Sequence, residues 1–504
     1  MRLVGQMAAR LARRRLATLR RHAGSPGEPQ QELLLRLMDR MARTAFGRQH
    51  GLAGVRTPGD LAAAVPLQDY ASMAPWWERA RRGEPDVTWP GPVRFWAISS
   101  GTTAGEKYLP VTGATIASSR RGGFDALVPH LAAGGGDLFD GKLLFLGGST
   151  ALRRDGPVFV GDNTGIMALH VPRCLSSWHT PHASIRAIPD WEAKIAAAAA
   201  QTAAEDLRLL AGVPSWIVMF GEAVLAHCRA QGRDVTTLAE VWPNLRLFVH
   251  GGVTFAPYRT RVLELVGQDL RCTDTYSASE GGMLAVQDTR DDPAMLPLLD
   301  RGAFFEFVPL DELGAASPRR FAADRIEPGV DYAVAVTTDA GIVSYLLGDV
   351  VRFTQRDPLR LVFAGRTAQS LNAFGEHVSG GELERGVAAA ASATEAVVSE
   401  FAVTVSYPTA DEPMGCHCYL IEFHREPSDL HLFARLLDES LRRGNEDYAT
   451  HRSYGLRAPV VEAVPPGLFT AWLRRHGKLG GQHKMPRVLD ADGARELRGI
   501  ALLP

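Results

Sequence analysis

Short apolar runs alternate with longer amphipathic stretches between about residue 90 and residue 375. The stretch Trp191–Leu210, which contains the alanine run 196–200, has the pattern of a helix. Strands that alternate with helices are typical of an α/β layer architecture. The runs that predict strands are Val93–Ile98, Lys142–Leu146, Trp216–Phe220, Leu245–Val249 and Phe304–Val308.

Two further apolar segments predict a pair of strands near the end of this region. Asp331–Thr337 and Gly341–Phe353 are separated by a turn around Asp339–Gly341. A glycine in so short a connection is typical of a β-hairpin.

The pattern changes after about Gly380, where shorter elements predict a smaller α+β domain. We expect a boundary between Phe374 and Gly381, with an N-terminal domain over 1–376 and a C-terminal domain over 377–504. The predicted elements of the smaller domain are the helices Gly381–Ala391 and Leu430–Arg443 and the strands Ala396–Val405 and Cys418–Phe423.

The first 27 residues predict a basic helix. They contain seven arginines and no acidic residue, and Leu3, Met7, Leu11 and Leu19 recur at roughly helical spacing. Such a pattern is found in transit peptides and in membrane-surface helices. In a chain this rich in arginine, a solvated surface helix is the interpretation we favour.

Composition narrows the class of protein. A chain of 504 residues is too long for one ordinary domain, and 46% hydrophobic with 22% charged residues is typical of a globular protein. The formal net charge of -1 argues against a protein that wraps nucleic acid. We find no run of about 20 apolar residues that would span a membrane. Five scattered cysteines form no disulfide framework, so we expect a reducing, cytoplasmic location.

Lysine is rare in this chain, because arginine supplies nearly all of the 55 basic residues. A retained lysine is a candidate for a compact positive charge on a phosphate, which a guanidinium does not provide. The five lysines are Lys107, Lys142, Lys194, Lys478 and Lys484.

A loop of small and hydroxyl residues at 99–107, Ser-Ser-Gly-Thr-Thr-Ala-Gly-Glu-Lys, follows the predicted strand Val93–Ile98. Small residues let backbone N–H groups approach an anion, while hydroxyls and a lysine add donors and charge. The loop lacks the spacing of the Walker motif, so it favours polyphosphate binding outside the P-loop fold. A plain surface turn is the alternative.

Two later motifs complete a nucleotide site. In Tyr-Ser-Ala-Ser-Glu-Gly-Gly at 276–282, the Tyr276 ring can stack on a purine and Glu280 can hold Mg²⁺ together with phosphate. In Tyr345–Val351 a strand carries Asp349 after a glycine, and a fixed carboxylate there suits a bidentate hydrogen bond to ribose hydroxyls.

Taken in order, these motifs make the chain resemble the auxin-responsive acyl-acid amido synthetases. This family is a branch of the adenylate-forming superfamily, which includes firefly luciferase and acyl-CoA ligases. The resemblance extends over most of the chain, and several ordered motifs make coincidence a poor explanation. The matching segments are Ser99–Lys107, Tyr276–Gly281, Tyr345–Val351, Gly365–Thr367 with Ser370–Asn372, Asn445–Tyr448 and Gly481–Arg487.

The resemblance implies an α/β fold with two parts. The large N-terminal adenylate-forming domain would hold sheets layered with helices and a small β-barrel-like part, and the C-terminal domain would be small, mobile and α+β. Members of the family use ATP and Mg²⁺ to convert a carboxylic acid into an acyl-adenylate. They then pass the acyl group to an amino acid amine and release AMP and pyrophosphate. We therefore expect a small-molecule acid and an amino acid as partners, no nucleic acid, no membrane span and a monomer.

The resemblance also implies a role for individual residues. Lys107, Glu280 and Lys484 would be catalytic, with Glu280 near the metal and Lys484 bridging the attacking carboxylate and the α-phosphate. Two anions must approach each other in that step, so a positioned cation reduces their repulsion. Arg366 would lie at the hinge within reach of the nucleotide. The implied cofactor-binding residues are Ser99, Ser100, Gly101, Thr102, Thr103, Gly105, Tyr276, Ser279, Asp349 and Arg366.

The acid pocket has a weaker sequence signal. Two segments resemble parts of the family that line the acid and nucleotide sites, and their apolar character fits an aromatic or alicyclic acid. Trp216 and Phe255 are equally well explained as core residues. The candidate substrate residues are Trp216, Gly251, Gly252, Val253 and Phe255.

This chain departs from the family pattern in three places. The phosphate loop is one residue shorter between Gly105 and Lys107, Leu346 replaces an arginine, and His377 stands where lysine is frequent. Slower adenylation, a different substrate or a degenerate site would each follow from these changes. The alternatives to an amido synthetase are an acyl- or aryl-CoA ligase, which uses the same first half-reaction with a thiol acceptor, and a non-catalytic nucleotide- or acid-binding homologue.

The triplet Cys416-His417-Cys418 is a further cluster of metal-ligand residue types. On a strand His417 faces away from both cysteines, so we favour structural packing over metal binding.

Overall fold

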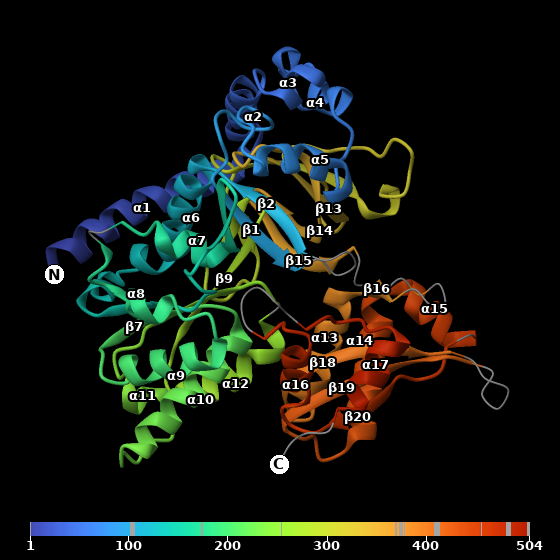
Figure 1. Cartoon of the computed structure of the whole chain (residues 1–504). Helices are drawn as coiled ribbons and strands as arrows, with labels where there is room; N and C mark the ends of the chain where they lie inside the picture. Colours follow the sequence, from blue (N-terminus) through green and yellow to red (C-terminus); the bar gives the residue numbers. More distant parts are fainter. Residues whose placement is uncertain are drawn as a thin grey trace. The chain divides into compact units, whose positions relative to one another are not determined.

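A computed structural model describes residues 2–100, 106–172, 175–253, 255–367, 370–371, 376, 378–407, 414–454, 456–479 and 485–500. The chain forms two compact units, shown in Figure 1. The first unit comprises Met1–Gly252 and Gln268–Val362, and the second comprises Val253–Gly267 and Phe363–Pro504.

A mixed sheet forms the centre of the first unit. Within the described residues its strand order is β12-β13-β14-β15-β11-β10-β9-β8-β7-β3-β6. Strands β6, β3, β7, β8 and β9 are parallel, whereas β9, β10, β11 and β15 pair antiparallel in that order. The strands are β3 (Lys142–Phe145), β6 (His179–Thr180), β7 (Leu207–Ala211), β8 (Leu247–Gly251), β9 (Arg271–Ala278), β10 (Gly282–Gln287), β11 (Met295–Pro297), β12 (Ala303–Pro309), β13 (Asp331–Thr338), β14 (Ile342–Arg356) and β15 (Leu359–Arg366).

A smaller sheet in the same unit has the order β2-β1-β5-β4. Strands β1 and β2 form an antiparallel pair, and β5 runs parallel to β1. The pair carries both ends of the Ser/Thr/Gly loop. The strands are β1 (Phe95–Ser100), β2 (Glu106–Val111), β4 (Arg153–Asp155) and β5 (Val158–Asp162).

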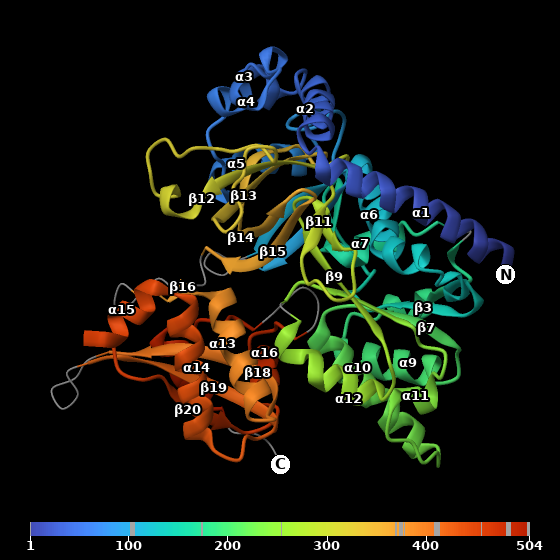
Figure 2. The same cartoon turned by 180° about the vertical axis from the view of Figure 1, so that it is seen from behind.

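The predicted N-terminal helix is present as α1 (Arg2–Gly24), but one of its faces is packed rather than solvated. Figures 1 and 2 show α1 beside α6 (Gly113–Ala132). Arg15 explains part of this packing, because its guanidinium lies 2.8 Å from Asp125 of α6 and 2.6 Å from Asp300. Burial of the small side chains Ala9 and Ala12 lets the helix lie close to the unit.

The other helices of the first unit follow from local sequence signals. Asp190 caps α9 by accepting a hydrogen bond from the Ala193 N–H, and Pro214 occupies the first turn of α10. These helices are α2 (Gly27–Met41), α3 (Ala45–Gln49), α4 (Pro58–Ala64), α5 (Tyr70–Arg81), α7 (Asn163–Leu169), α8 (Ala183–Arg186), α9 (Trp191–Thr202), α10 (Pro214–Ala230) and α11 (Leu238–Val241).

The second unit is built on the three-stranded sheet β18-β19-β20. Successive residues of β18 point to opposite faces, so Phe401 and Val403 pack in one core and Ala402 in another. Helices α13 and α14 cover the first face, and α16 and α17 cover the second. The elements are α12 (Arg259–Val266), β16 (Ser370–Leu371), β17 (Val378–Ser379), α13 (Gly380–Ala393), β18 (Val397–Ser406), β19 (Cys416–Arg425), α14 (Leu430–Gly444), α15 (Glu446–Tyr454), β20 (Val460–Val464), α16 (Leu468–Arg475) and α17 (Ala491–Arg498).

Most predicted elements are confirmed to within a few residues, but two predictions are wrong. The apolar run Trp216–Phe220 is not a strand, because it lies inside the helix α10. The predicted helix Trp191–Leu210 is too long, since α9 ends at Thr202 and β7 begins at Leu207. Short apolar runs do not distinguish a buried helix from a buried strand by periodicity alone. No helix in the described part of the chain has the length and apolar character that crossing a membrane requires.

Candidate functional site

Tyr276 and Asp349, predicted to bind the adenine and the ribose of one nucleotide, meet in the first unit. Tyr276 lies on β9 and Asp349 on β14, and both side chains are buried. The Tyr276 Oη donates a hydrogen bond of 2.9 Å to Asp349 Oδ2. The structure therefore brings together two motifs that are 73 positions apart.

This contact requires the sheet to curl. Strands β15, β11 and β10 lie between β14 and β9 in the strand order. In a flat sheet, neighbouring strands are about 4.8 Å apart, so the two strands would be separated by about 19 Å. A direct hydrogen bond between their side chains shows that the sheet curls strongly between these strands, which agrees with the expected barrel-like part.

The glycine before Asp349 permits a bulge that sets the position of the carboxylate. Against β13, the three residues Leu347–Asp349 of β14 oppose the single residue Val334. Gly348 has a φ of 77°, in the left-handed region that glycine adopts without strain. Local backbone geometry, rather than strand pairing alone, thus directs Asp349 toward Tyr276.

Ser279 and Glu280 lie in the turn between β9 and β10, both half-buried. The backbone carbonyl of Glu280 accepts a hydrogen bond of 2.9 Å from Thr338 Oγ1, at the end of β13. Gly282 has a φ of 69°, and a Cβ there would lie 2.7 Å from Ser119 Oγ on α6. The turn is therefore fixed from two sides by elements distant in sequence.

Asp339 lies near this turn, and we did not single it out from the sequence. Its backbone carbonyl accepts a hydrogen bond of 2.7 Å from Thr112 Oγ1, at the start of α6. Burial raises the pKa of its carboxyl to about 6, although hydrogen bonds from Ser118 and Thr115 favour the charged form. In the sequence Asp339 could be recognised only as a turn residue.

The Ser/Thr/Gly loop is described only at its two ends. Ser99 pairs with Lys107 and Ser100 with Glu106 in the β1–β2 ladder. The Lys107 Nζ lies 5.5 Å from the centroid of the Tyr70 ring. The Tyr70 hydroxyl in turn accepts a hydrogen bond of 3.0 Å from the Tyr108 N–H. The predicted loop residues Gly101, Thr102, Thr103 and Gly105 lie outside the described residues.

Gly251 and Gly252 end β8 beside the Tyr276 strand. Gly251 pairs with Thr275 on β9, and a Cβ on Gly251 would lie 2.4 Å from the Thr275 carbonyl oxygen. Gly252 follows with a φ of 86°. Only glycine fits here without displacing backbone. The fold therefore favours glycine at both positions, independently of their predicted contact with substrate.

His250, one position earlier, is a further titratable residue that sequence reasoning missed. It is buried, and its Nδ1 lies 3.3 Å from Asp274 Oδ1 on β9. A lone histidine inside a strand carries no sequence signal that separates this role from ordinary packing.

Trp216 occupies a core position in the first unit. It lies on α10, is 7% exposed, and its ring centroid is 4.9 Å from that of Trp191 on α9. This packing favours the core interpretation of Trp216, and contact with an acid stays a prediction.

Three of the predicted residues that the structure describes belong to the second unit. Val253 and Phe255 are half-buried in the segment that precedes α12. Arg366 is exposed at the end of β15. A Cβ on the preceding Gly365 would lie 2.8 Å from the Gly381 backbone nitrogen, so this strand end approaches the start of α13 closely.

Lys484 lies outside the described residues, but the chain that follows it is firmly held in the second unit. Arg487 is buried, and its Nε donates a hydrogen bond of 2.9 Å to Glu384 Oε1. The same guanidinium forms an ion pair with Glu400 and a hydrogen bond of 3.2 Å to the Tyr258 hydroxyl. These carboxylates hold the pKa of Arg487 well above its usual range, despite its burial. From the sequence, Arg487 was identified only as the last residue of the matching segment Gly481–Arg487. Its buried partners Glu384, Glu400 and Tyr258 were not found from the sequence, because a buried ion pair has no distinct local pattern.

His417 forms a buried pair with Glu376, with 2.9 Å between Nε2 and Oε1. The neighbouring Cys416 and Cys418 place their sulfurs 3.8 Å apart. No group of three metal-ligating side chains is found among the residues that the structure describes.

A curled sheet, a Ser/Thr/Gly hairpin, a buried Tyr–Asp pair and a separate α+β unit together define the fold of an adenylate-forming enzyme. Two kinds of solved structure resemble it. GH3.15 acyl acid amido synthetase has a TM-score of 0.79 and 17% identity, over 96% of this chain and 94% of that chain. A 2-hydroxyisobutyryl-CoA ligase in the postadenylation state has a TM-score of 0.56 and 12% identity, over 94% and 91%.

The family assignment follows from sequence. Models described as the GH3 family N-terminal domain, central domain and C-terminal domain match residues 15–198, 296–366 and 381–492. This chain belongs to the GH3 family. A probable indole-3-acetic acid-amido synthetase, GH3.12 of Oryza sativa subsp. japonica, is 24% identical over 96% of this chain and 94% of its own length. A jasmonoyl-L-amino acid synthetase of the same rice, GH3.5, is 27% identical over 55% and 51%.

Proposed function

We infer that this chain is an ATP-dependent, AMP-forming acyl-acid amido synthetase. It activates a carboxylic acid as an acyl-adenylate and transfers the acyl group to the amine of an amino acid. The observation that carries this conclusion is the match of three GH3 domains, in order, along the chain. The Tyr276–Asp349 contact supports it, because a nucleotide site needs these two motifs in one place.

In the first half-reaction a carboxylate oxygen attacks the α-phosphorus of ATP, and the bond to pyrophosphate breaks. We propose that Asp349 accepts hydrogen bonds from the ribose hydroxyls. Tyr276 donates to one oxygen of that carboxylate and fixes its orientation before the nucleotide binds. Its ring would lie against the adenine.

Charge develops on the leaving pyrophosphate, and the chain offers cations and donors for it. We propose that the loop between β1 and β2, with Ser99, Ser100 and Lys107 at its ends, binds the β- and γ-phosphates. Glu280 would hold Mg²⁺ together with phosphate oxygens, and the ion would supply Lewis-acid stabilisation of the developing charge.

Lys484 is proposed to bridge the carboxylate and the α-phosphate. A single positive charge between two anions lowers the repulsion that opposes their approach. Arg487 would act as a positioning residue in this step. It anchors the chain three residues after the lysine through buried contacts to Glu384, Glu400 and Tyr258.

In the second half-reaction the amine nitrogen attacks the acyl carbon, AMP leaves and the amine loses a proton. The relatives are named for indole-3-acetic acid and for jasmonoyl conjugates, and another solved GH3.15 structure is titled as a complex with 2,4-DB. We propose an aromatic or alicyclic carboxylic acid as the substrate of this chain. The half-buried Phe255 and the glycines 251–252 are its proposed contacts. Cytoplasmic location and a monomeric state stay predictions.

ATP–pyrophosphate exchange with a panel of aromatic, alicyclic and aliphatic acids tests the first half-reaction. We expect acid-dependent exchange with the aromatic or alicyclic members. No exchange with any acid would instead favour a non-catalytic binding protein.

Adding amino acids or coenzyme A to the activated acid tests the acceptor. Mass spectrometry should detect the amide and no thioester. A thioester as the sole product would show that the chain is a CoA ligase.

A further inference from the structure

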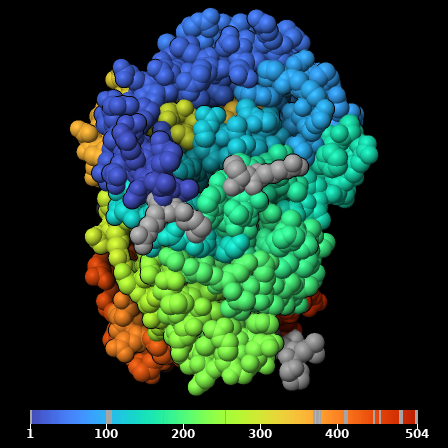
Figure 3. Space-filling model, turned by 90° about the vertical axis from the view of Figure 1, so that its left-hand side faces the viewer, coloured from blue at the N-terminus to red at the C-terminus, as the bar shows by residue number. Residues whose placement is uncertain are grey.

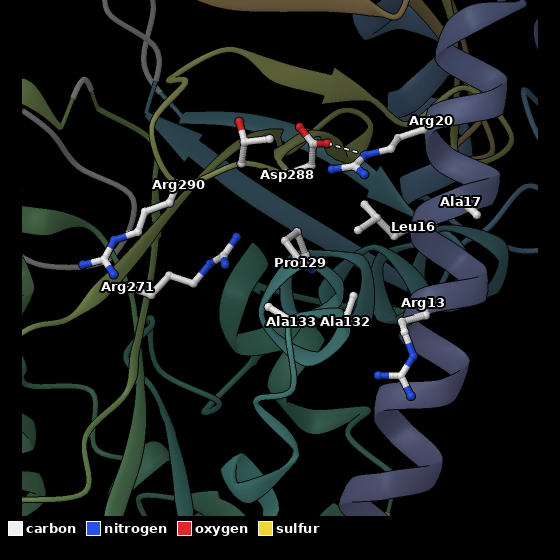
Figure 4. Close-up of a pocket in the computed structure, with 11 residues that line it drawn as sticks. Arg13, Leu16, Ala17, Arg20, Pro129, Ala132, Ala133, Arg271, Asp288 and Arg290 are labelled. Carbon is white, nitrogen blue, oxygen red and sulfur yellow. Dashed lines mark hydrogen bonds and ion pairs between the residues drawn. The ribbon is translucent and has the colours of Figure 1, made fainter.

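A pocket of about 510 Å³ lies in the first unit, apart from the Tyr276–Asp349 contact. Its walls come from α1, from the end of α6, from the start of β9 and from the chain that follows β10 (Figure 4). Figure 3 shows the residues of α1, in dark blue, at the molecular surface.

The pocket carries an excess of positive charge. Four arginines line it, and Asp288 is its only acidic lining residue within the described residues. The lining arginines are Arg13, Arg20, Arg271 and Arg290.

Carboxylates of the protein already neutralise part of this positive charge. Arg20 lies 2.8 Å from Asp288, and the same carboxylate is shared with Arg360 at 2.5 Å. Arg290 forms an ion pair with Asp269. Across the described part of the chain, neither Arg13 nor Arg271 bonds to a carboxylate.

Two donors on the pocket wall have no acceptor. The Nε of Arg271 and the Oγ1 of Thr289 are buried and have no hydrogen-bond partner within the described residues. A buried donor without an acceptor is costly, so an acceptor that reached these atoms from the pocket would be bound favourably. In Figure 4 the Arg271 side chain points toward Pro129.

The local electrostatics agree with a binding site for an anion. Burial lowers the pKa of Arg271, and the charge of Arg290 lowers it further. His130 follows the lining residue Pro129, and burial, with the charge of Arg271 as the second cause, lowers its pKa to about 4. Burial, reinforced by the positive charge of Arg271, thus keeps this imidazole neutral near pH 7.

The remaining wall is apolar. Leu16 and Ala17 of α1 face Pro129, Ala132 and Ala133 at the end of α6. Guanidinium groups bind phosphate oxygens through paired hydrogen bonds, and two arginines that form no ion pair among the described residues match a dianion. We propose that this pocket binds a small organic phosphate, a dianionic monoester whose apolar body packs on Leu16 and Pro129.

The site is separate from the proposed adenylation site. Arg271 and Tyr276 are five residues apart on β9, which is about 17 Å along a strand, and an odd separation places them on opposite faces. Occupation of one site therefore leaves the other open.

Calorimetry on the full chain with phenyl phosphate and with inorganic phosphate tests the proposal. Arg271→Gln removes the orphan donor and its charge, and we expect at least a tenfold loss of phenyl phosphate affinity. Arg13→Gln, at an exposed position whose loss does not threaten folding, should weaken binding about threefold. Inorganic phosphate should bind more weakly than the ester, because it cannot use the apolar wall.

Arg14→Gln is the matched control, since it removes an exposed arginine of α1 that does not line the pocket. The affinity of Arg14→Gln for phenyl phosphate should stay within about twofold of that of the unaltered chain. Equal phenyl phosphate affinity in Arg271→Gln and Arg14→Gln would overturn the proposal, as would equal affinity for the two anions. ATP–pyrophosphate exchange, measured on the same variants, should be unchanged, so failure of this proposal is distinguishable from failure of the proposed enzyme activity.

Discussion

The contact between Tyr276 and Asp349 shows how single atoms prepare the proposed nucleotide site. Both residues are buried, so the hydroxyl and the carboxylate have little access to water when no nucleotide is bound. A hydrogen bond to a charged group contributes about 1.5–3 kcal/mol. The contribution of the Tyr276 hydroxyl to nucleotide binding can therefore be tested separately from that of the ring.

Tyr276→Phe removes that hydroxyl and keeps the ring. We expect ATP affinity to fall about tenfold, from the strength of a charge-assisted hydrogen bond, and Asp349→Ala to lower it further. Calorimetric titration with ATP measures both. Tyr332→Phe is the control, because its hydroxyl accepts a hydrogen bond from the Glu327 N–H elsewhere in the unit. Unchanged affinity in Tyr276→Phe would contradict the assignment.

The buried carboxyl of Asp339 predicts a pH dependence of stability. Its pKa of about 6 in the folded chain lies above the ordinary 3.8, so the folded state keeps its proton as the pH rises through this range. Ionisation then opposes folding, and stability relative to Asp339→Asn should fall between about pH 4 and pH 6, by about 2 kcal/mol. Urea unfolding of both chains across this range measures the difference. Parallel stability profiles for the two chains would mean that the carboxyl is not buried as described.

At the scale of the element, hydrophobic pattern predicted strands and helices well where length or alternation was clear. The hairpin of β13 and β14 and the elements α13, α14, β18 and β19 fall close to their predicted ranges. The prediction of a strand at Trp216–Phe220 failed because five apolar residues fit either a strand or one face of a buried helix. Pro214, two residues earlier, was the available signal, since proline is frequent in the first turn of a helix.

The site was predictable in type but not in arrangement. The residue types in its motifs indicate what each motif can bind, so Tyr276, Glu280 and Asp349 could be selected from sequence. The curl of the sheet and the bulge at Gly348 depend on pairings between distant strands, which no local pattern encodes. Asp339 and the buried contacts of Arg487 were missed because the surroundings of these residues in the fold, and not their neighbours in sequence, make them unusual.

Adjacent glycines in α6 give a matched test of element packing. A Cβ on Gly122 would lie 2.5 Å from the Met283 Cβ of β10, whereas a Cβ on Gly123 meets nothing within 4 Å. Gly122→Ala should destabilise the chain by about 1–3 kcal/mol through overpacking. Gly123→Ala should stabilise it by about 0.5–1 kcal/mol through helix propensity. Urea unfolding midpoints measure both, and a shared sign would contradict the described packing of α6 on β10.

At the scale of the whole molecule, the two units divide the proposed chemistry between them. The first contains the Tyr276–Asp349 contact and both ends of the proposed phosphate loop, and the second contains Lys484. Binding of ATP and its reaction should therefore be separable by substitution.

Lys484→Ala should abolish acid-dependent ATP–pyrophosphate exchange and leave ATP affinity within about threefold, because the lysine is proposed to act on the approach of the two anions. Exchange kinetics and calorimetry measure the two effects. Lys478→Ala, which removes a lysine six positions earlier in the same unit, should leave both unchanged. An equal loss of binding and exchange in Lys484→Ala would contradict its proposed role.

The segment 253–267 leaves β8, packs with the second unit and returns to begin β9. Three peptide connections therefore join the units, after positions 252, 267 and 362, where two independently folded domains would need only one. A body tethered at three points cannot swivel freely about a single bond, so the accessible rotations are those that all three tethers tolerate together. Gly252 and Gly267, with φ values of 86° and 72°, occupy the first two tethers. A bulkier residue at either would restrict the backbone of both units at once, although it belongs to the interior of neither.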